Sequence, residues 1–143
     1  MSALYNIARR GFLTEVTVGA FIGQINWEAD DFRVALVSAG YAFNEENTSM
    51  DNVDPGDIIQ DEGLVNTGSL PSGIATADST VFPTVTGDPA IAVIIYRDNG
   101  TAEPLDNALI AYLDDAITGL PVTPNGGDIT ILWGGGNDQI FRL

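Results

Sequence analysis

The stretch that most constrains the fold runs from Leu109 to Leu143 and alternates short apolar runs with turns rich in proline and glycine. Three apolar segments have the length and side-chain content of β-strands, namely 108–113, 129–133 and 139–143. Between the first two lie two prolines and Asn125-Gly126-Gly127, which supply the fixed and positive φ values of a tight reversal. We therefore expect three strands here, with Gly134 to Asp138 forming a hairpin turn between the last two.

The rest of the chain also favours strands. Residues 90–96 are almost continuously apolar, which predicts a strand buried on both faces, and 108–113 is its natural antiparallel partner. A further strand is expected at 32–38, after a turn at 27–31 in which Trp27 fills the core. With seven to nine such segments, we predict a single mainly β domain over 1–143, an antiparallel β-sandwich or barrel.

One helix is expected, at residues 2–14. Apolar residues recur there at spacings of three and four (Leu4, Ile7, Ala8 and Phe12), and Ser2 is placed to cap the start. Arg9 and Arg10 fall on or near the opposite face. Such a pair is either a solvated helix face or a contact to an acidic partner, because arginine pairs well with carboxylates.

Residues 40–62 are expected to form an acidic surface loop. This segment has few apolar residues and a turn at Pro55-Gly56, and it holds seven acidic residues without a base: Glu45, Glu46, Asp51, Asp54, Asp57, Asp61 and Glu62. A loop of this length in a compact domain is either mobile or ordered by a partner.

The charge balance excludes several classes of partner. The chain has 20 acidic residues against 5 arginines and no lysine, for a net charge of −15. Such a charge repels nucleic acids and anionic membranes. No apolar run reaches the roughly 18 residues of a membrane-spanning helix. The N-terminal residues lack the pattern of a signal peptide, so we expect synthesis in the cytoplasm.

Catalytic machinery is not expected. Without cysteine or histidine the chain can form no thiol nucleophile, histidine base or common zinc site. Adjacent acid pairs occur at Asp30-Asp31, Glu45-Glu46 and Asp114-Asp115. Neighbours on a strand point to opposite faces and seldom form one site. We therefore expect a non-enzymatic protein with no catalytic residues and no cofactor.

Calcium remains an alternative at two places. The Gly134 to Asp138 segment resembles one copy of the calcium-binding nonapeptide of β-roll proteins, whose sites form between stacked copies. A hairpin turn explains the same residues more simply. Asp51, Asp54 and Asp57 do not have the spacing of an EF-hand loop. No metal site is therefore assigned.

Several segments together resemble a family of small tailed-bacteriophage virion proteins. The segments that carry the resemblance are 3–13 (ALYNIARRGFL), 25–37 (INWEADDFRVALV), 94–98 (IIYRD), 109–112 (LIAY), 119–131 (GLPVTPNGGDITI) and the final Phe-Arg-Leu. The likeness thins between Asn44 and Pro89. Residues 14–24 are longer than the family's link, and Glu45-Glu46-Asn47 stand where the family commonly has a histidine.

The resemblance implies a structural component of a virion, assembled from protein made in the host cytoplasm. We expect a capsid decoration (cement) protein that binds and stabilises the assembled head; the alternative is a tail or fibre component involved in host attachment. Its partners would be the major capsid protein or other virion proteins, and it would form a homo-oligomer, taken here as a trimer. The residues expected to contact partners are Arg9, Arg10, Phe12, Glu45, Glu46, Asp51 and Asp54.

Overall fold

The computed structural model describes residues 2–115, 117–134 and 136–143. Within these ranges the protein is built mainly from antiparallel β-sheets with one short α-helix, which confirms the expected fold class. Every sheet formed by these residues is open, with two edge strands, so the packing is sandwich-like and the barrel alternative does not apply.

The largest sheet has five antiparallel strands in the order β1-β10-β9-β4-β5. Their bounds are β1 (Ala3–Leu4), β10 (Leu109–Leu113), β9 (Ala92–Arg97), β4 (Phe32–Val37) and β5 (Ile58–Gly63). All five residues of β10 are buried, as are the first five of β9. This confirms both the expected pairing of these two strands and the burial of both faces of β9.

Three smaller sheets complete the β structure. One has the order β11-β12-β8, from β11 (Ile117–Thr118), β12 (Ile129–Trp133) and β8 (Thr80–Phe82). Another has the order β13-β7-β6, from β13 (Gln139–Arg142), β7 (Ile74–Thr76) and β6 (Gly68–Leu70). The third is a hairpin of β2 (Val16–Val18) and β3 (Phe21–Gly23).

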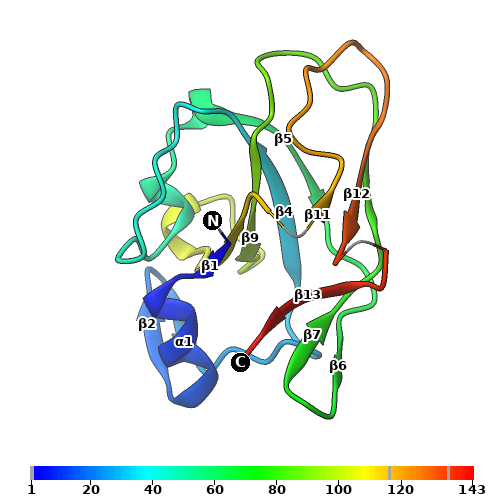
Figure 1. Ribbon diagram of the computed structural model, residues 1–143. Coiled ribbons are helices and arrows are strands. Elements are labelled where there is room, and N and C mark those ends of the chain that lie inside the picture. Colours follow the sequence, from blue (N-terminus) through cyan, green and yellow to red (C-terminus); the bar gives the residue numbers. More distant parts are fainter. Residues whose placement is uncertain (1, 116, 135) are drawn as a thin grey trace.

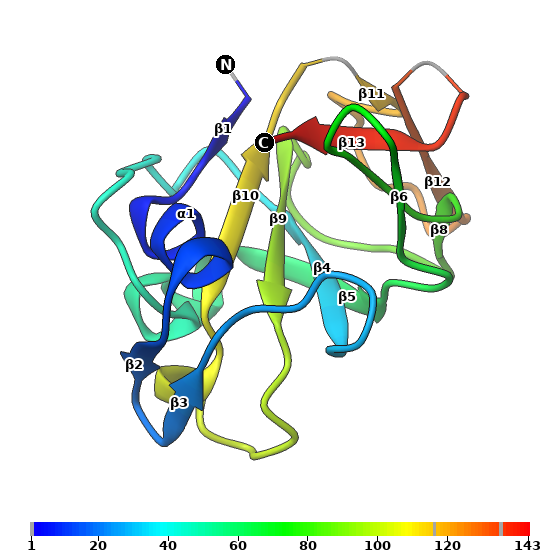
Figure 2. The same cartoon turned by 90° about the horizontal axis from the view of Figure 1, so that it is seen from below.

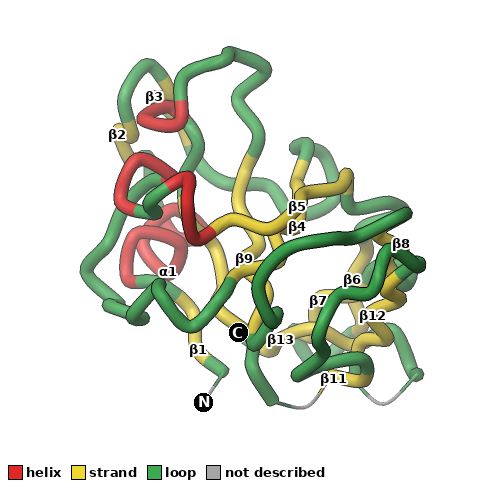
Figure 3. The backbone as a smooth tube through the Cα atoms, turned by 90° about the horizontal axis from the view of Figure 1, so that it is seen from above, coloured by secondary structure: helices red, strands yellow, loops and turns green. Residues whose placement is uncertain are grey.

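The elements form layers around the five-stranded sheet. The helix α1 (Asn6–Leu13) lies on one side of it with the β2-β3 hairpin, and the two three-stranded sheets lie on the other (Figures 1 and 2). The 3₁₀-helices are η1 (Met50–Asn52), η2 (Pro55–Asp57), which leads into β5, and η3 (Pro104–Asp106). Figure 3 shows the helical segments in red, gathered on the α1 side of the molecule. One continuous apolar core runs through these layers.

Trp27 fills that core, as expected. It is 7% exposed and packs on Phe32 and Phe141, with ring centroids 4.6 and 5.0 Å away. Its indole N–H donates to the carbonyl oxygen of Thr76 at 3.2 Å. The side chain therefore ties β4 to the sheet of β13 and β7 and satisfies its own polar group.

The helix is shorter than predicted. α1 begins at Asn6, because residues 3–4 pair with β10 as β1. Tyr5 is the N-cap residue and makes no side-chain cap, so the prediction that Ser2 caps the helix was wrong. The Ser2 hydroxyl instead donates to the backbone oxygen of Asp115 at 3.1 Å. Pairing across the sheet outweighs the local capping signal because it satisfies backbone groups that a fraying first turn would leave open.

The segment 40–62 is not a loose surface loop, which corrects the prediction. Its last residues form β5, the edge strand beside β4. Before β5, the buried side chains of Tyr41, Met50 and Val53 pin the segment to the core. The acidic residues stay at the surface while the sparse apolar ones carry the packing, and sparse apolar residues give no periodic signal in the sequence.

The C-terminal strands exist as predicted but separate in space. β12 pairs with β11 and β8, whereas β13 pairs with β7. The predicted hairpin between 129–133 and 139–143 is therefore wrong.

Candidate functional site

The five arginines divide into two groups. Arg33 pairs with Asp61 at 2.9 Å, and Arg97 pairs with Asp30 at 3.0 Å while its guanidinium lies 3.8 Å above the Phe21 ring. These two hold the scaffold together. The other three are Arg9, Arg10 and Arg142, which are all exposed. Within the described residues, Arg10 and Arg142 make no ion pair or side-chain hydrogen bond.

Helix α1 presents Arg9 and Arg10 to the outside. Ile7, Ala8 and Gly11 form its buried face, which leaves both arginines on the solvent side, as the sequence predicts. Phe12 is half-buried, with its ring centroid 6.0 Å from that of Phe141 in β13. The helix therefore touches β13 through Phe12.

Arg9 is held loosely. It donates a hydrogen bond to the Asn6 side-chain oxygen at 2.7 Å and lies 3.8 Å from a Glu45 carboxylate oxygen. The side chains of Arg9 and Glu45 are 48% and 55% exposed. An ion pair this long and this exposed is worth about 0–1 kcal/mol, so Arg9 remains available to a better partner.

The predicted acidic contacts fall into two sets. Glu45 and Glu46 meet the start of α1: the Asn6 backbone N–H donates to the Glu45 backbone oxygen at 2.9 Å, and the Asn6 amide donates to Glu46 at 2.6 Å. Asp51 is an exposed residue of η1. Asp54 caps η2 by accepting from the Gly56 N–H at 2.8 Å. The structure thus brings Arg9, Glu45 and Glu46 together, whereas neither aspartate pairs with an arginine in the described part of the chain.

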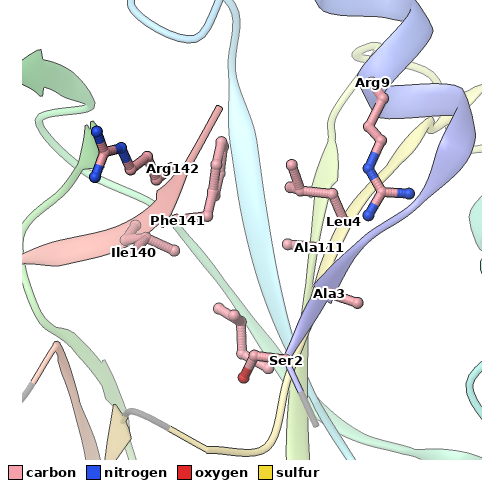
Figure 4. Close-up of a pocket in the computed structure, with 9 residues that line it drawn as sticks. Ser2, Ala3, Leu4, Arg9, Ala111, Ile140, Phe141 and Arg142 are labelled. Carbon is pink, nitrogen blue, oxygen red and sulfur yellow. The ribbon is translucent and has the colours of Figure 1, made fainter. Parts of the chain in front are cut away.

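A groove opens between α1 and β1 on one side and β13 on the other. A hollow of about 330 Å³ lies against Leu4, Arg9 and Phe141. Figure 4 shows Phe141 pointing across the gap toward Leu4 and Arg9 reaching down from α1, while Arg142 leaves β13 on the far side. A second hollow, about 300 Å³, adjoins it at Leu4, Arg9 and Arg142, and a third, about 360 Å³, follows β13 past Ile140.

The groove lining has an unusual charge for this protein. The described residues lining the three hollows include Arg9 and Arg142 and no acidic residue, although the chain has 20 acids. The rest of the lining is largely apolar, with two strongly exposed leucines beside it, Leu13 at 82% and Leu143 at 63%. The groove is therefore a small cationic and apolar region on an acidic body.

The sequence analysis found Arg9, Arg10 and Phe12 but missed Leu4 of β1 and the opposite wall formed by β13. Leu4, Ile140, Phe141 and Arg142 were interpreted only as helix or strand residues. One signal was present: Arg142 is one of only five basic residues. Nothing in the sequence placed it across a gap from Arg9, because that depends on β13 pairing with β7 instead of β12.

The best-connected carboxylate is structural. Asp61 accepts from Arg33 at 2.9 Å and from the Tyr96 hydroxyl at 2.8 Å. Burial would raise the pKa of Asp61, but the hydrogen bonds from Arg33 and Tyr96 outweigh burial and lower the pKa below its usual value. Burial and the Asp61 contact raise the pKa of Tyr96. This trio joins β5, β4 and β9 across one face of the sheet.

The two places considered for calcium differ in their geometry. The Asp54 carboxylate is engaged as the cap of η2, and Asp57 lies in η2 itself. In the Gly134 to Asp138 turn, the Asn137 side-chain oxygen accepts from the Gln139 N–H at 3.2 Å, and Asp138 has a φ of 62°. Gly135 lies outside the described residues. No group of three or more acidic side chains suited to a metal ion occurs among the residues that are described.

The amino-acid sequence matches no protein-family model, and no curated protein is significantly similar to it. The described chain contains no helix with the length and apolar character needed to cross a membrane.

Proposed function

We propose that this protein is a non-enzymatic structural component of a tailed-bacteriophage particle, a capsid decoration protein that binds the assembled head. Two observations support the proposal. The segments 3–13, 25–37, 94–98, 109–112 and 119–131 resemble small virion proteins of this kind, and the fold presents a cationic, apolar groove on an otherwise acidic surface. The groove carries the binding argument because it places Arg9, whose contact with Glu45 is long and exposed, beside an apolar lining.

The physical mechanism is preferential binding. A protein that binds only the assembled shell stabilises that shell by mass action. A symmetric oligomer, such as the expected trimer, engages several shell subunits together, so contacts that are weak singly become strong as a set. Arg9 and Arg10 on α1 would pair with carboxylates of the major capsid protein. The surrounding negative charge keeps decorated particles apart in solution.

The test is binding to purified empty capsids, measured by co-sedimentation and by the melting temperature of the shell. We expect the protein to co-sediment and to raise that temperature. Replacing Arg9 and Arg10 by glutamine removes two positive charges from α1 and should weaken binding about thirtyfold if each charged contact contributes near 1 kcal/mol. Glutamate at the exposed Ser79 and Thr86 changes the net charge equally, away from α1, and serves as the matched control.

Equal binding of the two double variants to the shells would show that Arg9 and Arg10 on α1 do not contact the shell. Failure of the unaltered protein to bind shells would remove head decoration itself. The number of copies per particle then separates the alternative, because a protein in a tail or fibre for host attachment is present in few copies and a decoration protein in many.

A further inference from the structure

Two edge strands with open backbones flank the groove. β1 is the edge of the five-stranded sheet, and β13 is the edge of its own sheet. The exposed edge of a strand is a template for another strand, and proteins usually blunt it with charge, proline or a covering segment. Neither edge carries an acidic residue or a proline.

In β1, the free backbone groups belong to Leu4. The Tyr5 N–H donates to the Ile110 oxygen at 3.0 Å. Hydrogen-bonded and non-bonded pairs alternate along an antiparallel ladder, so Leu4, opposite Ala111, occupies a non-bonded position. Its N–H and C=O therefore face away from β10, at the open edge of the sheet, while Leu4 and Ala111 line the groove from the sheet face.

In β13, the corresponding residue is Arg142. The Leu143 N–H donates to the Gly73 oxygen at 2.9 Å, and Phe141 stands opposite Ala75. By the same alternation, the N–H and C=O of Arg142 face away from β7. The β13 wall of the groove thus presents an unpaired donor and acceptor on the main chain, whereas the β1 wall contributes Leu4 from the sheet face.

We propose that this groove binds an extended, acidic segment of a partner protein, which adds a strand at the edge of β13. Its main chain would bond to the N–H and C=O of Arg142, its alternate apolar side chains would lie against Leu4 and Phe141, and a carboxylate would pair with Arg9. The charge of the lining favours acid, because Arg9 reaches into the groove and the described lining contains no Asp or Glu side chain. The inference deepens the proposed function by naming what part of the partner enters.

A peptide binding assay on the full chain tests this inference without a particle. The probe is a fluorescent peptide of about six residues, the length of an ordinary strand, that alternates valine and threonine around one central glutamate. A second peptide carries lysine instead. We expect fluorescence anisotropy to show tighter binding of the glutamate peptide by about two- to fivefold, the worth of an exposed ion pair. The variant Arg9→Glu should reverse this preference, whereas Arg9→Gln should abolish it.

A matched pair at position 142 tests the backbone contact. Arg142→Pro and Arg142→Gln both remove the charge, but only proline removes the N–H that faces the groove. Proline is tolerated on an edge strand when its nitrogen points outward, and the residue is exposed. We expect the proline variant to bind the glutamate peptide about three- to tenfold more weakly than the glutamine variant. The variants Leu4→Pro and Leu4→Val repeat the comparison on β1. Equal binding of the glutamate peptide by these two variants would place the added strand at β13 alone.

Several outcomes would overturn the inference: equal binding of the two peptides, no reversal in Arg9→Glu, or equal binding by the two variants at position 142. A change of oligomeric state in Arg142→Pro but not in Arg142→Gln would assign the groove to a second copy of this chain. If Arg142→Pro fails to fold, the inference is still tested by whether Arg9→Glu reverses the preference between the two peptides. The shell-binding test is separate. Peptide selectivity without shell binding would refute head decoration but support peptide binding in the groove. Shell binding without peptide selectivity would support head decoration but refute peptide binding in the groove.

Discussion

Gly11 lies where helix α1 comes closest to the segment that follows it. A Cβ atom at this position would sit 2.3 Å from Ile25 Cδ1 and 2.7 Å from Ile25 Cγ1. Ile25 is 4% exposed and its backbone N–H donates to the Gly11 oxygen at 2.8 Å. Glycine therefore weakens the isolated helix but permits the contact, so close approach and not helix propensity explains the residue.

We expect Gly11→Ala to destabilise the protein by about 1 kcal/mol. Overpacking a core site costs about 1–3 kcal/mol, which exceeds the gain of about 1 kcal/mol in helix propensity. Adding Ile25→Val removes the nearest clashing atom, so the double variant should lose less free energy of unfolding than the sum of the two single variants. Urea titrations measure all three values, and a stabilising Gly11→Ala would contradict the packing argument.

Asp61 should give the protein an acid-sensitive contribution to stability. Its pKa in the folded protein is lowered, so the contribution is complete above the unfolded pKa, near 3.9, and is lost as the pH falls through the folded value. The carboxylate is 41% exposed, which limits the effect to about 1 kcal/mol. The free energy of unfolding of the wild type should exceed that of Asp61→Asn at about pH 6, and the difference should shrink toward about pH 2.

The measurement is a urea titration at each pH for both proteins. A difference that stays constant with pH would show that Asp61 contributes through its shape and neutral hydrogen bonds alone. Tyr96→Phe is a useful companion because it removes one of the two hydrogen bonds to the carboxylate. Its own pH dependence should therefore lie between those of the wild type and Asp61→Asn.

At the scale of elements, segment 40–53 is held by aromatic side chains. The hydroxyls of Tyr5 and Tyr41 are 2.8 Å apart, and the Asn47 amide donates to the Tyr41 hydroxyl at 3.1 Å. Phe43 packs between Tyr5 and Tyr112, with ring centroids 5.2 Å from each. Tyr5 is fully buried, and burial with the Tyr41 contact raises its pKa.

We expect Tyr41→Phe to loosen this segment. The change leaves the buried Tyr5 hydroxyl without its partner, which costs about 1–3 kcal/mol. Hydrogen exchange should then speed up at the amides of 40–53 more than in β9 and β10. Tyr112→Phe is the matched control, because the Tyr112 hydroxyl makes no hydrogen bond among the described residues. Equal exchange in the two variants would show that apolar packing alone holds the segment.

Strand positions were readable from the sequence, whereas among strand partners only the pairing of β9 with β10 was. The apolar runs at 32–38, 90–96 and 108–113 identify three buried strands because burial on both faces leaves a continuous signal. The pairing of β13 with β7 leaves no signal in the sequence, because both strands are short. The connection between β12 and β13 has the composition of a hairpin turn, which favours the wrong partner. The candidate site divides in the same way. Arg9, Arg10 and Phe12 follow from helical spacing, but the wall formed by Phe141 and Arg142 depends on the pairing.

For the whole molecule, the net charge of −15 works against compactness. Raising sodium chloride from about 0.01 M to about 1 M shortens the Debye length from about 30 Å to about 3 Å. We expect the melting temperature to rise with salt, because screening relieves repulsion more than it weakens the few ion pairs. Each kcal/mol gained corresponds to about 4 °C for a domain of this size.

A differential scanning fluorimetry series in sodium chloride checks this prediction. Magnesium chloride at the same ionic strength serves as the control for specific cation binding, since general screening predicts similar curves for both salts. A melting temperature that falls with sodium chloride would mean that the pairs Arg33–Asp61 and Arg97–Asp30 dominate the electrostatic free energy.

The pairing of β1 with β10 delays the completion of folding during synthesis on the ribosome. Ser2 bonds to Asp115, a residue 113 positions later, and a ribosome adding about 5–20 residues per second needs about 6–20 s to cover that distance. Until then β1 has no partner strand, and the apolar face of α1 lacks the contact that β10 later provides. Folds with such distant pairings also form slowly once complete, in milliseconds to seconds. Aggregation of the nascent chain therefore competes with folding during those seconds.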